Sequence, residues 1–389
     1  MPPAPSGFRY IFFSVFALLL LTFQTLQAQE SYEFSESKFH ISGEGGGALF
    51  HTGPEGEFPN DEFRVDEARL FVEAAVWDDV YVFGEVNLLT REAFSEDLEL
   101  GELYVQFENV SKLWNQDQLL NVRLGRFDIP FGEEYLTRDA IDNPLISHSL
   151  SDLWGIDEGI EAYGSYRWIE YVFAVQNGGD SILHDFTADK SISGRITLKA
   201  TPALHFSFSG MRTGEIDAHK DQFAALWFGN RLLSVPGSTE ATTAFRANVF
   251  EGDGHFQWQS GHLHVAGGRL DYRDDNTARD LARDIRYFQT EAIQNIASSR
   301  QQTLYGGVRF SKMTSAGGFP IIGNADADLF YGDYIELTDR IWNLAFGLGY
   351  RIGRHVLLKT EYNIEHGRLV DGSKREKENF FGAEAAFKF

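Results

Sequence analysis

The stretch that decides the fold is Glu67-Ala68-Arg69-Leu70-Phe71-Val72-Glu73-Ala74-Ala75-Val76-Trp77, which the turn Asp78-Asp79 separates from Val80-Tyr81-Val82-Phe83-Gly84-Glu85-Val86-Asn87-Leu88-Leu89. In the first run Leu70, Val72, Ala74 and Val76 share one face, and Glu67, Arg69, Phe71 and Glu73 share the other. A period of two is typical of a β-strand, and a two-residue connection joins antiparallel strands into a hairpin. The hairpin therefore has one apolar face and one face that carries charge.

The same alternation recurs along the chain, and the connections between the segments alternate between short and long. A soluble β-sandwich also alternates, but short turns alternating with long loops are typical of an outer-membrane barrel. We therefore predict an all-β fold, a 16-stranded antiparallel up-and-down transmembrane β-barrel with long outer loops, over residues 37–389. The predicted strands span 37–51, 63–77, 79–89, 98–108, 119–127, 156–167, 168–177, 189–200, 203–213, 242–258, 262–273, 301–312, 323–333, 340–352, 355–366 and 378–389.

The two ends of the chain agree with export to an outer membrane. Arg9, an apolar run over 11–21 and a small residue at Ala28 have the layout of a signal peptide, which we expect to span 1–28. Residues 29–36 would then be a short periplasmic segment. An even strand count places both termini in the periplasm. The terminal Phe389 resembles the assembly signal of such barrels.

Composition narrows the class further. There is no cysteine, so disulfides do not hold the fold together, and a net charge of −23 makes nucleic acid an unsuitable partner. No later stretch has the apolar length of a transmembrane helix. Aromatic residues at predicted strand ends indicate the girdles of a barrel: Trp77, Tyr81, Phe107, Trp168, Trp227, Phe228, Trp258, Trp342 and Tyr350.

One segment has a different period. Within 277–296, Leu281, Ile285, Phe288, Ala292 and Ile296 recur at helical spacing after Asn276-Thr277, a suitable N-cap. We expect a helix here, inside a long outer loop over 274–300.

The candidate functional region is the loop after the fifth predicted strand, residues 128–155. In barrels that leave an aqueous channel, such a loop commonly folds inward and narrows the bore, and acidic constrictions favour cations. His148 adds positive charge only at lower pH. The charged candidates for the constriction are Asp128, Glu133, Glu134, Arg138, Asp139, Asp142 and Asp152.

Strand parity also places charges on the inner wall. The acidic candidates are Glu67, Glu73, Glu85, Glu102 and Glu161, and the opposing basic ones are Arg69, Arg123, Arg195, Arg246, Arg309 and Lys359. Inward aromatic residues Phe83, Tyr104 and Tyr163 would suit a track for a sugar. We expect no metal site, because His262 and His264 share a face without an indicated third ligand.

The run Gly125-Arg126-Phe127-Asp128-Ile129-Pro130-Phe131 resembles the G-[QR]-F-x-x-P-F signature of the phosphate-selective porin O and P family. The stretch from Ala68 to Asn87 is also similar to that family, and the resemblance covers the second to sixth predicted strands best. It implies an inward-folding third loop, a narrow pore and a homotrimer. The acidic loop and the lack of a regular arginine ladder depart from phosphate-selective members.

We therefore expect a porin that passes small polar solutes and ions, with a mild cation preference and no cofactor. A channel selective for phosphate or another anion, or for a sugar, remains open. An outer-membrane enzyme or a plugged structural barrel is a more remote alternative, since no G-x-S-x-G elbow or other catalytic constellation is present. The expected surroundings are outer-membrane lipid and lipopolysaccharide of a Gram-negative bacterium.

Overall fold

The structure is a computed structural model that describes residues 39–53, 58, 60–89, 98–178, 185, 188–217, 244–274, 283–319, 338–375 and 379–389. Its strands are β1 Phe39–Thr52, β2 Glu62–Trp77, β3 Val80–Leu89, β4 Glu99–Phe107, β5 Asn121–Asp128, β6 Ile156–Tyr166, β7 Ile169–Gln176, β8 Ser191–Thr201, β9 Leu204–Arg212, β10 Ile216–Asp217, β11 Ala244–Trp258, β12 Gly261–Asp274, β13 Arg283–Ser298, β14 Gln302–Phe319, β15 Thr338–Ile352, β16 Val356–Leu369 and β17 Phe380–Lys388. Two short 3-10 helices, η1 Val110–Trp114 and η2 Glu134–Thr137, complete the described elements. No helix among these residues is long and apolar enough to cross a membrane.

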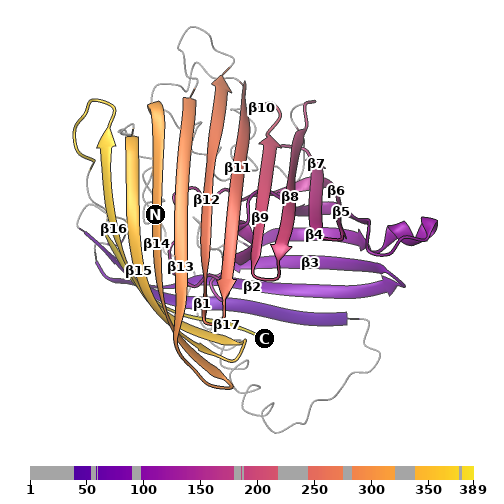
Figure 1. The fold of residues 1–389 in the computed structure, drawn as a ribbon, viewed down its shortest axis with the longest axis horizontal. Coiled ribbons are helices and arrows are strands. Elements are labelled where there is room, and N and C mark those ends of the chain that lie inside the picture. Colours follow the sequence, from indigo (N-terminus) through magenta and orange to yellow (C-terminus); the bar gives the residue numbers. More distant parts are fainter. Residues whose placement is uncertain are drawn as a thin grey trace, which may run out of the picture. The chain divides into compact units, whose positions relative to one another are not determined.

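The strands form one closed antiparallel sheet, in which consecutive strands pair except that β9 pairs with β11, and β17 returns to pair with β1. The two-residue β10 lies beside β11 next to β9, so the barrel counts sixteen strands. Figure 1 shows the sheet curving from the tall strands β11–β16 round to β1–β4, which run across the view. The last residue, Phe389, exchanges backbone hydrogen bonds with Gly43 of β1, which brings the C-terminus next to the start of the barrel.

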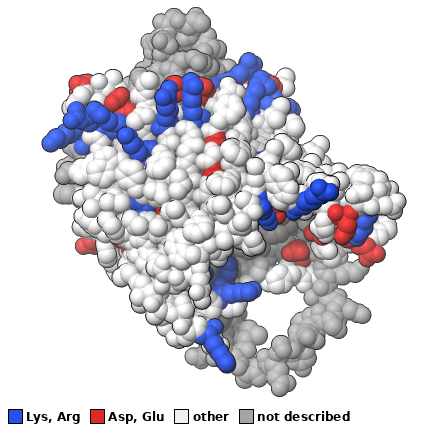
Figure 2. All heavy atoms as spheres, viewed as in Figure 1, with Lys and Arg blue, Asp and Glu red and all other residues white. Residues whose placement is uncertain are grey.

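The outward faces of the strands are apolar and the inward faces are polar, as the alternation predicts. On β3 and β4, for example, Leu88 and Leu103 are exposed, whereas Glu85 and Asn87 are buried inside. In Figure 2 the middle of the face over β11–β16 is almost free of charge. Basic side chains gather above this uncharged belt. The exposed Arg286, Arg340 and Arg368 lie near the ends of β13, β15 and β16 at one edge of the sheet. An outward-facing apolar band is typical of a barrel in lipid.

The helix expected within 277–296 is wrong. Residues 283–298 form β13, which pairs with β12 and β14 along its length, and the expected long outer loop over 274–300 is therefore wrong as well. The helical spacing arose because β13 buries apolar side chains on its inner face too, including Ile285 and Ile293. The strand expected over 323–333 lies outside the described residues, as do the signal peptide and the segment 29–36. The count of sixteen is confirmed, but with β13 in place of that segment.

Candidate functional site

The loop between β5 and β6, residues 129–155, folds into the barrel, and we call it the infolded loop. Its neck closes where the Ile129 amide donates to the Gly155 carbonyl over 2.8 Å. Gly125 precedes it on β5 with φ of +136°, and a Cβ there would lie 2.2 Å from the Leu103 carbonyl oxygen. Only glycine tolerates this approach of two strands. The sequence thus requires Gly125 at the position where the G-R-F signature has its glycine.

One side of the infolded loop is packed against the wall of β9 and β11–β17. Ile129, Phe131 and Leu153 share a buried apolar cluster with residues of β9 and β11–β15. Two further clusters bury Ile141 and Ile146 against residues of β1, β13, β14, β16 and β17. Burial of this size holds the loop in the lumen.

Buried charges of the same wall hold the backbone of the infolded loop. The Lys359 ammonium donates to the carbonyls of Ala140, Asn143 and Leu145, at 2.7, 3.1 and 2.8 Å. The Glu361 carboxylate accepts from the amides of Ile146 and Ser147, at 2.6 and 2.9 Å. Arg309 donates to the Ser147 carbonyl over 2.5 Å and pairs with Glu291. Strand parity puts Glu361 on the same face as Lys359, but only Lys359 was among the wall candidates.

Acidic candidates from the loop and from the wall meet around one arginine. Arg69 of β2 lies 2.6 Å from Asp139, 3.2 Å from Glu67 and 3.8 Å from Glu85. Burial raises the pKa of the Asp139 carboxyl, Arg69 lowers it and Glu67 raises it again, with a net rise. Glu44 of β1 belongs to the same group, and its carboxylate lies close enough to those of Glu67 and Asp139 to share a ligand.

The other acidic candidates of the loop are engaged separately. Glu133 pairs with His205 of β9 at 3.0 Å, and Asp142 pairs with Lys388 of β17 at 3.0 Å. Glu134 accepts from the amide of Ser149 at 2.8 Å, within the loop. The candidate constriction residues are therefore spread over the loop, and they do not form a single ring.

Arg138, His148 and Asp152 form an ion-pair group inside the loop, with both Arg138 and His148 at 2.8 Å from Asp152. Burial raises the pKa of the Asp152 carboxyl, but the charges of Arg138 and His148 outweigh burial and hold it well below its usual range. Glu133 shows the same balance, since hydrogen bonds and charge from His205 overcome burial and lower its pKa.

The opposite wall, β4–β8, is polar and borders an open cavity of about 520 Å³. Arg123 of β5 pairs with Glu161 of β6 at 3.2 Å and lies 4.2 Å over the ring of Tyr104. Glu102 accepts from the Asp128 amide at 3.0 Å, and Arg195 donates to the Gly132 carbonyl of the loop. Glu102, Arg123, Asp128, Glu161 and Arg195 all line this cavity.

A second cavity of about 710 Å³ lies between the infolded loop and the wall of β7–β9 and β11–β15. Glu133, Glu134 and Asp142 of the loop line it, and the wall contributes four histidines, His205, His255, His262 and His264. Sequence reasoning missed this group because its members come from three strands, and only the strand register brings them together.

One wall residue lies elsewhere than expected. Arg246 faces outward, because Ala247 and Val249 beside it belong to the inner cluster, and it pairs with Glu215 at 2.8 Å. Glu73 lies opposite Phe83 of the inner wall and is exposed near the turn to β3.

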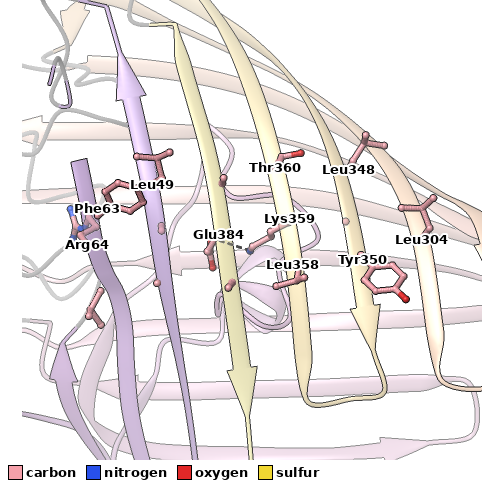
Figure 3. A pocket seen from close by; sticks show the side chains of 16 residues that line it. Leu49, Phe63, Arg64, Leu304, Leu348, Tyr350, Leu358, Lys359, Thr360 and Glu384 are labelled. Carbon is pink, nitrogen blue, oxygen red and sulfur yellow. Dashed lines mark ion pairs between the residues drawn. The ribbon is translucent and has the colours of Figure 1, made fainter. Parts of the chain in front are cut away.

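The outer surface over β1, β2 and β14–β17 is hollowed into a depression of about 810 Å³, shown in Figure 3. Apolar side chains such as Phe63, Leu348 and Leu358 surround it, while Lys359 and Glu384 pair at 3.5 Å on the inner side of the sheet. The depression is therefore an apolar surface at the height of the uncharged belt.

No protein-family model matches the sequence, and no curated protein matches it. The fold, in contrast, has many solved counterparts. In-vitro folded OmpT, an outer-membrane protein of Vibrio cholerae, is 12% identical with a TM-score of 0.59, over 92% of this chain and 100% of that chain. An anion-selective porin from Comamonas acidovorans is 9% identical with a TM-score of 0.59, over 91% and 100% of the chains. OprB of Pseudomonas putida is 10% identical with a TM-score of 0.57, over 90% and 94%.

These likenesses define the class of fold, the 16-stranded barrel of outer-membrane porins. The finer resemblance to the phosphate-selective O and P family stays a prediction.

Proposed function

We propose that this chain is an outer-membrane channel for the passive diffusion of small polar solutes and ions. The observation that carries the proposal is the combination of an uncharged outer belt with a charged interior that an infolded loop narrows but leaves hollow. A barrel whose core is filled completely by side chains does not need a charged interior, whereas a water-filled path needs a polar lining.

We propose a mild cation preference. The cavity along β4–β8 is lined by four carboxylates, Glu102, Asp128, Glu161 and Glu170, against the two cations Arg123 and Arg195. The second cavity shares Glu170 and Arg195 with the first and adds four carboxylates against Lys199, Arg309 and Arg351, beside its four histidines. Carboxylate-rich linings favour cations by electrostatics.

We further propose that residues 1–28 are removed on export and that Phe389 is the barrel assembly signal. The exposed Arg286, Arg340 and Arg368 would meet phosphate groups of lipopolysaccharide at the outer edge of the belt, because guanidinium groups bind phosphate in a bidentate manner. A homotrimer is proposed from the family resemblance, and one structure of Vibrio cholerae OmpT is a trimer form.

Reconstitution tests the channel directly. Folded protein in planar bilayers is expected to give discrete conductance steps, with a reversal potential in a salt gradient that indicates cations. Liposomes that carry it should swell in small sugars and less in larger ones. A correctly folded barrel that conducts no ions and admits no sugar would identify a plugged or enzymatic barrel and overturn the proposal.

A sugar-selective channel is the second candidate, because aromatic rings follow one another along the inner wall. Phe71 stacks on Phe83 at 6.0 Å, and Phe83 stacks on Tyr104 at 5.1 Å. Arg123 then lies over both Tyr104 and Tyr163. If sugars block the current of the unchanged protein but not that of the Tyr104→Ala variant, the sugar-selective channel is favoured over a general porin.

A further inference from the structure

The four histidines of the second cavity form a cluster defined by the strand register. His255 of β11 stands directly opposite His205 of β9 on one side and His264 of β12 on the other. His262 is two residues before His264 and therefore lies on the same inner face. The ring of His255 lies 4.9 Å from that of His205, 5.3 Å from that of His262 and 6.4 Å from that of His264. Four of the chain's eleven histidines thus meet in one place.

Three of these rings are oriented by carboxylates. The Nε2 atom of His205 lies 3.0 Å from Glu133, that of His264 lies 3.1 Å from Asp253, and that of His262 lies 3.5 Å from Glu291. A neutral imidazole that donates through Nε2 keeps its lone pair on Nδ1. Carboxylates in this position are the usual second shell of histidine ligands, because they fix the tautomer and make the other nitrogen a stronger donor.

From this arrangement we propose that His205, His255, His262 and His264 form a binding site for a divalent transition metal ion, zinc or copper(II). Several imidazoles on one face match the ligand preference of these ions, and histidines opposite each other on paired strands have Cβ atoms about 4.5–5.5 Å apart. Glu133, Asp253 and Glu291 also supply negative potential, which offsets the nearby cations Arg195 and Arg309. Of these cations, Arg309 already pairs with Glu291 and Arg195 with the Gly132 carbonyl.

The rings of His205 and His262 stack on that of His255, and the ring of His264 is tilted against it, so binding requires a rotation of the side chains that turns their nitrogens toward one centre. Zinc–nitrogen bonds of about 2.0–2.1 Å need ligand nitrogens roughly 3.3 Å apart, which is closer than the present ring centroids. The adjoining cavity of about 710 Å³ leaves room for this rotation, and His205 and His262 keep about 30% of their side-chain surface exposed. Rotamer changes of exposed side chains take nanoseconds or less.

The carboxylate group Glu44, Glu67 and Asp139 is the competing location for a cation in the described residues. The Arg69 guanidinium already pairs with this group, at 2.6 Å from Asp139 and 3.2 Å from Glu67. Oxygen ligands also favour calcium and magnesium over zinc and copper. The two locations therefore differ in ligand chemistry, and spectroscopy separates them.

Metal binding to the full mature protein in detergent tests the site without relying on channel activity. We expect calorimetry to show that one zinc ion binds per chain. Bound copper(II) should show nitrogen hyperfine structure in electron paramagnetic resonance. His255→Phe keeps a ring in the stack but removes its nitrogens, and it should weaken zinc binding about tenfold or more. Asp253→Asn should weaken it by about 10–100-fold through His264.

The matched control is His366→Phe on β16, a histidine whose ring lies tilted against that of Trp342 and which is not among the residues that line the cavity. Its zinc affinity should equal that of the unchanged protein, and every variant is used only if it shows the heat-dependent gel shift of a folded barrel. Three outcomes would overturn the proposal. The copper spectrum could show oxygen ligands only, or the zinc affinity could be unchanged in both His255→Phe and Asp253→Asn. Zinc binding could also be lost in Glu44→Gln but not in the histidine variant.

Discussion

The two walls of the barrel make different kinds of contact with the infolded loop. Toward β11–β17 the loop buries Phe131, Ile141 and Ile146 and is held by Lys359 and Glu361. Toward β4–β8 it faces a polar cavity. The comparison teaches that the apolar packing of a loop inside a lumen can come from one wall, while the other wall contributes polar contacts, such as that of Arg195 with the Gly132 carbonyl, and still lines a path for water. Substitutions on the wall that packs against the loop should therefore mainly change stability, and substitutions on the polar wall should mainly change transport.

The largest expected effect concerns the wall of β11–β17, which packs against the infolded loop. Lys359→Ala removes three hydrogen bonds to the loop backbone and leaves Glu384, 3.5 Å away, without this cation. Removing one partner of a buried pair costs about 3–5 kcal/mol, so the free energy of unfolding in urea should fall by that amount. Single-channel currents should become noisier as the loop moves.

Lys312→Ala is the matched control for this prediction, since Lys312 is an exposed lysine of β14. It should change stability by less than about 0.5 kcal/mol. Equal effects of the two substitutions, or quiet currents in Lys359→Ala, would remove the distinction between the walls.

The second effect, smaller, lies within the loop and depends on pH. The folded pKa of Asp152 is lowered, so its pairing with Arg138 contributes stability that is fully present above the unfolded value of about 3.9. That contribution is lost as pH falls through the lower folded pKa. Asp152→Asn should therefore cost about 2–3 kcal/mol at pH 7, and the difference should shrink only below about pH 4. A difference that vanishes already at pH 6 would contradict the assignment to Asp152.

The same contrast between walls explains what the sequence could predict. On β2–β8 the inner face meets water and polar groups, so alternation from Leu70 to Ile196 is regular and the strands were predicted close to their observed bounds. On β13 the inner face meets the loop, and Ile285, Tyr287 and Ile293 are buried there. With apolar residues on both faces, a period of two cannot be distinguished from helical spacing.

The site divides in the same way. The family resemblance of the run from Gly125 to Phe131 predicted that the loop leaves β5 and folds inward, because this signal is contained in adjacent residues. The pairings of Lys359 with Ala140, or of His255 with His205, join residues far apart in the chain. They depend on register around the closed barrel, which single strands do not specify.

The smallest expected effect concerns the polar wall. Arg123→Gln removes one of two cations from the β4–β8 cavity and frees Glu161, whose carboxylate it pairs with at 3.2 Å. One charge at this distance, partly screened by water, is worth about 1 kcal/mol, so cation over anion permeability should rise by up to about fivefold. Reversal potentials in a salt gradient measure this change, with Arg286→Gln on the exposed outer face as the control that should leave selectivity unaltered. Because Arg123 does not hold the infolded loop, current noise should stay at the level of the unchanged protein. Noise rising to that of Lys359→Ala would mean that both walls fix the loop.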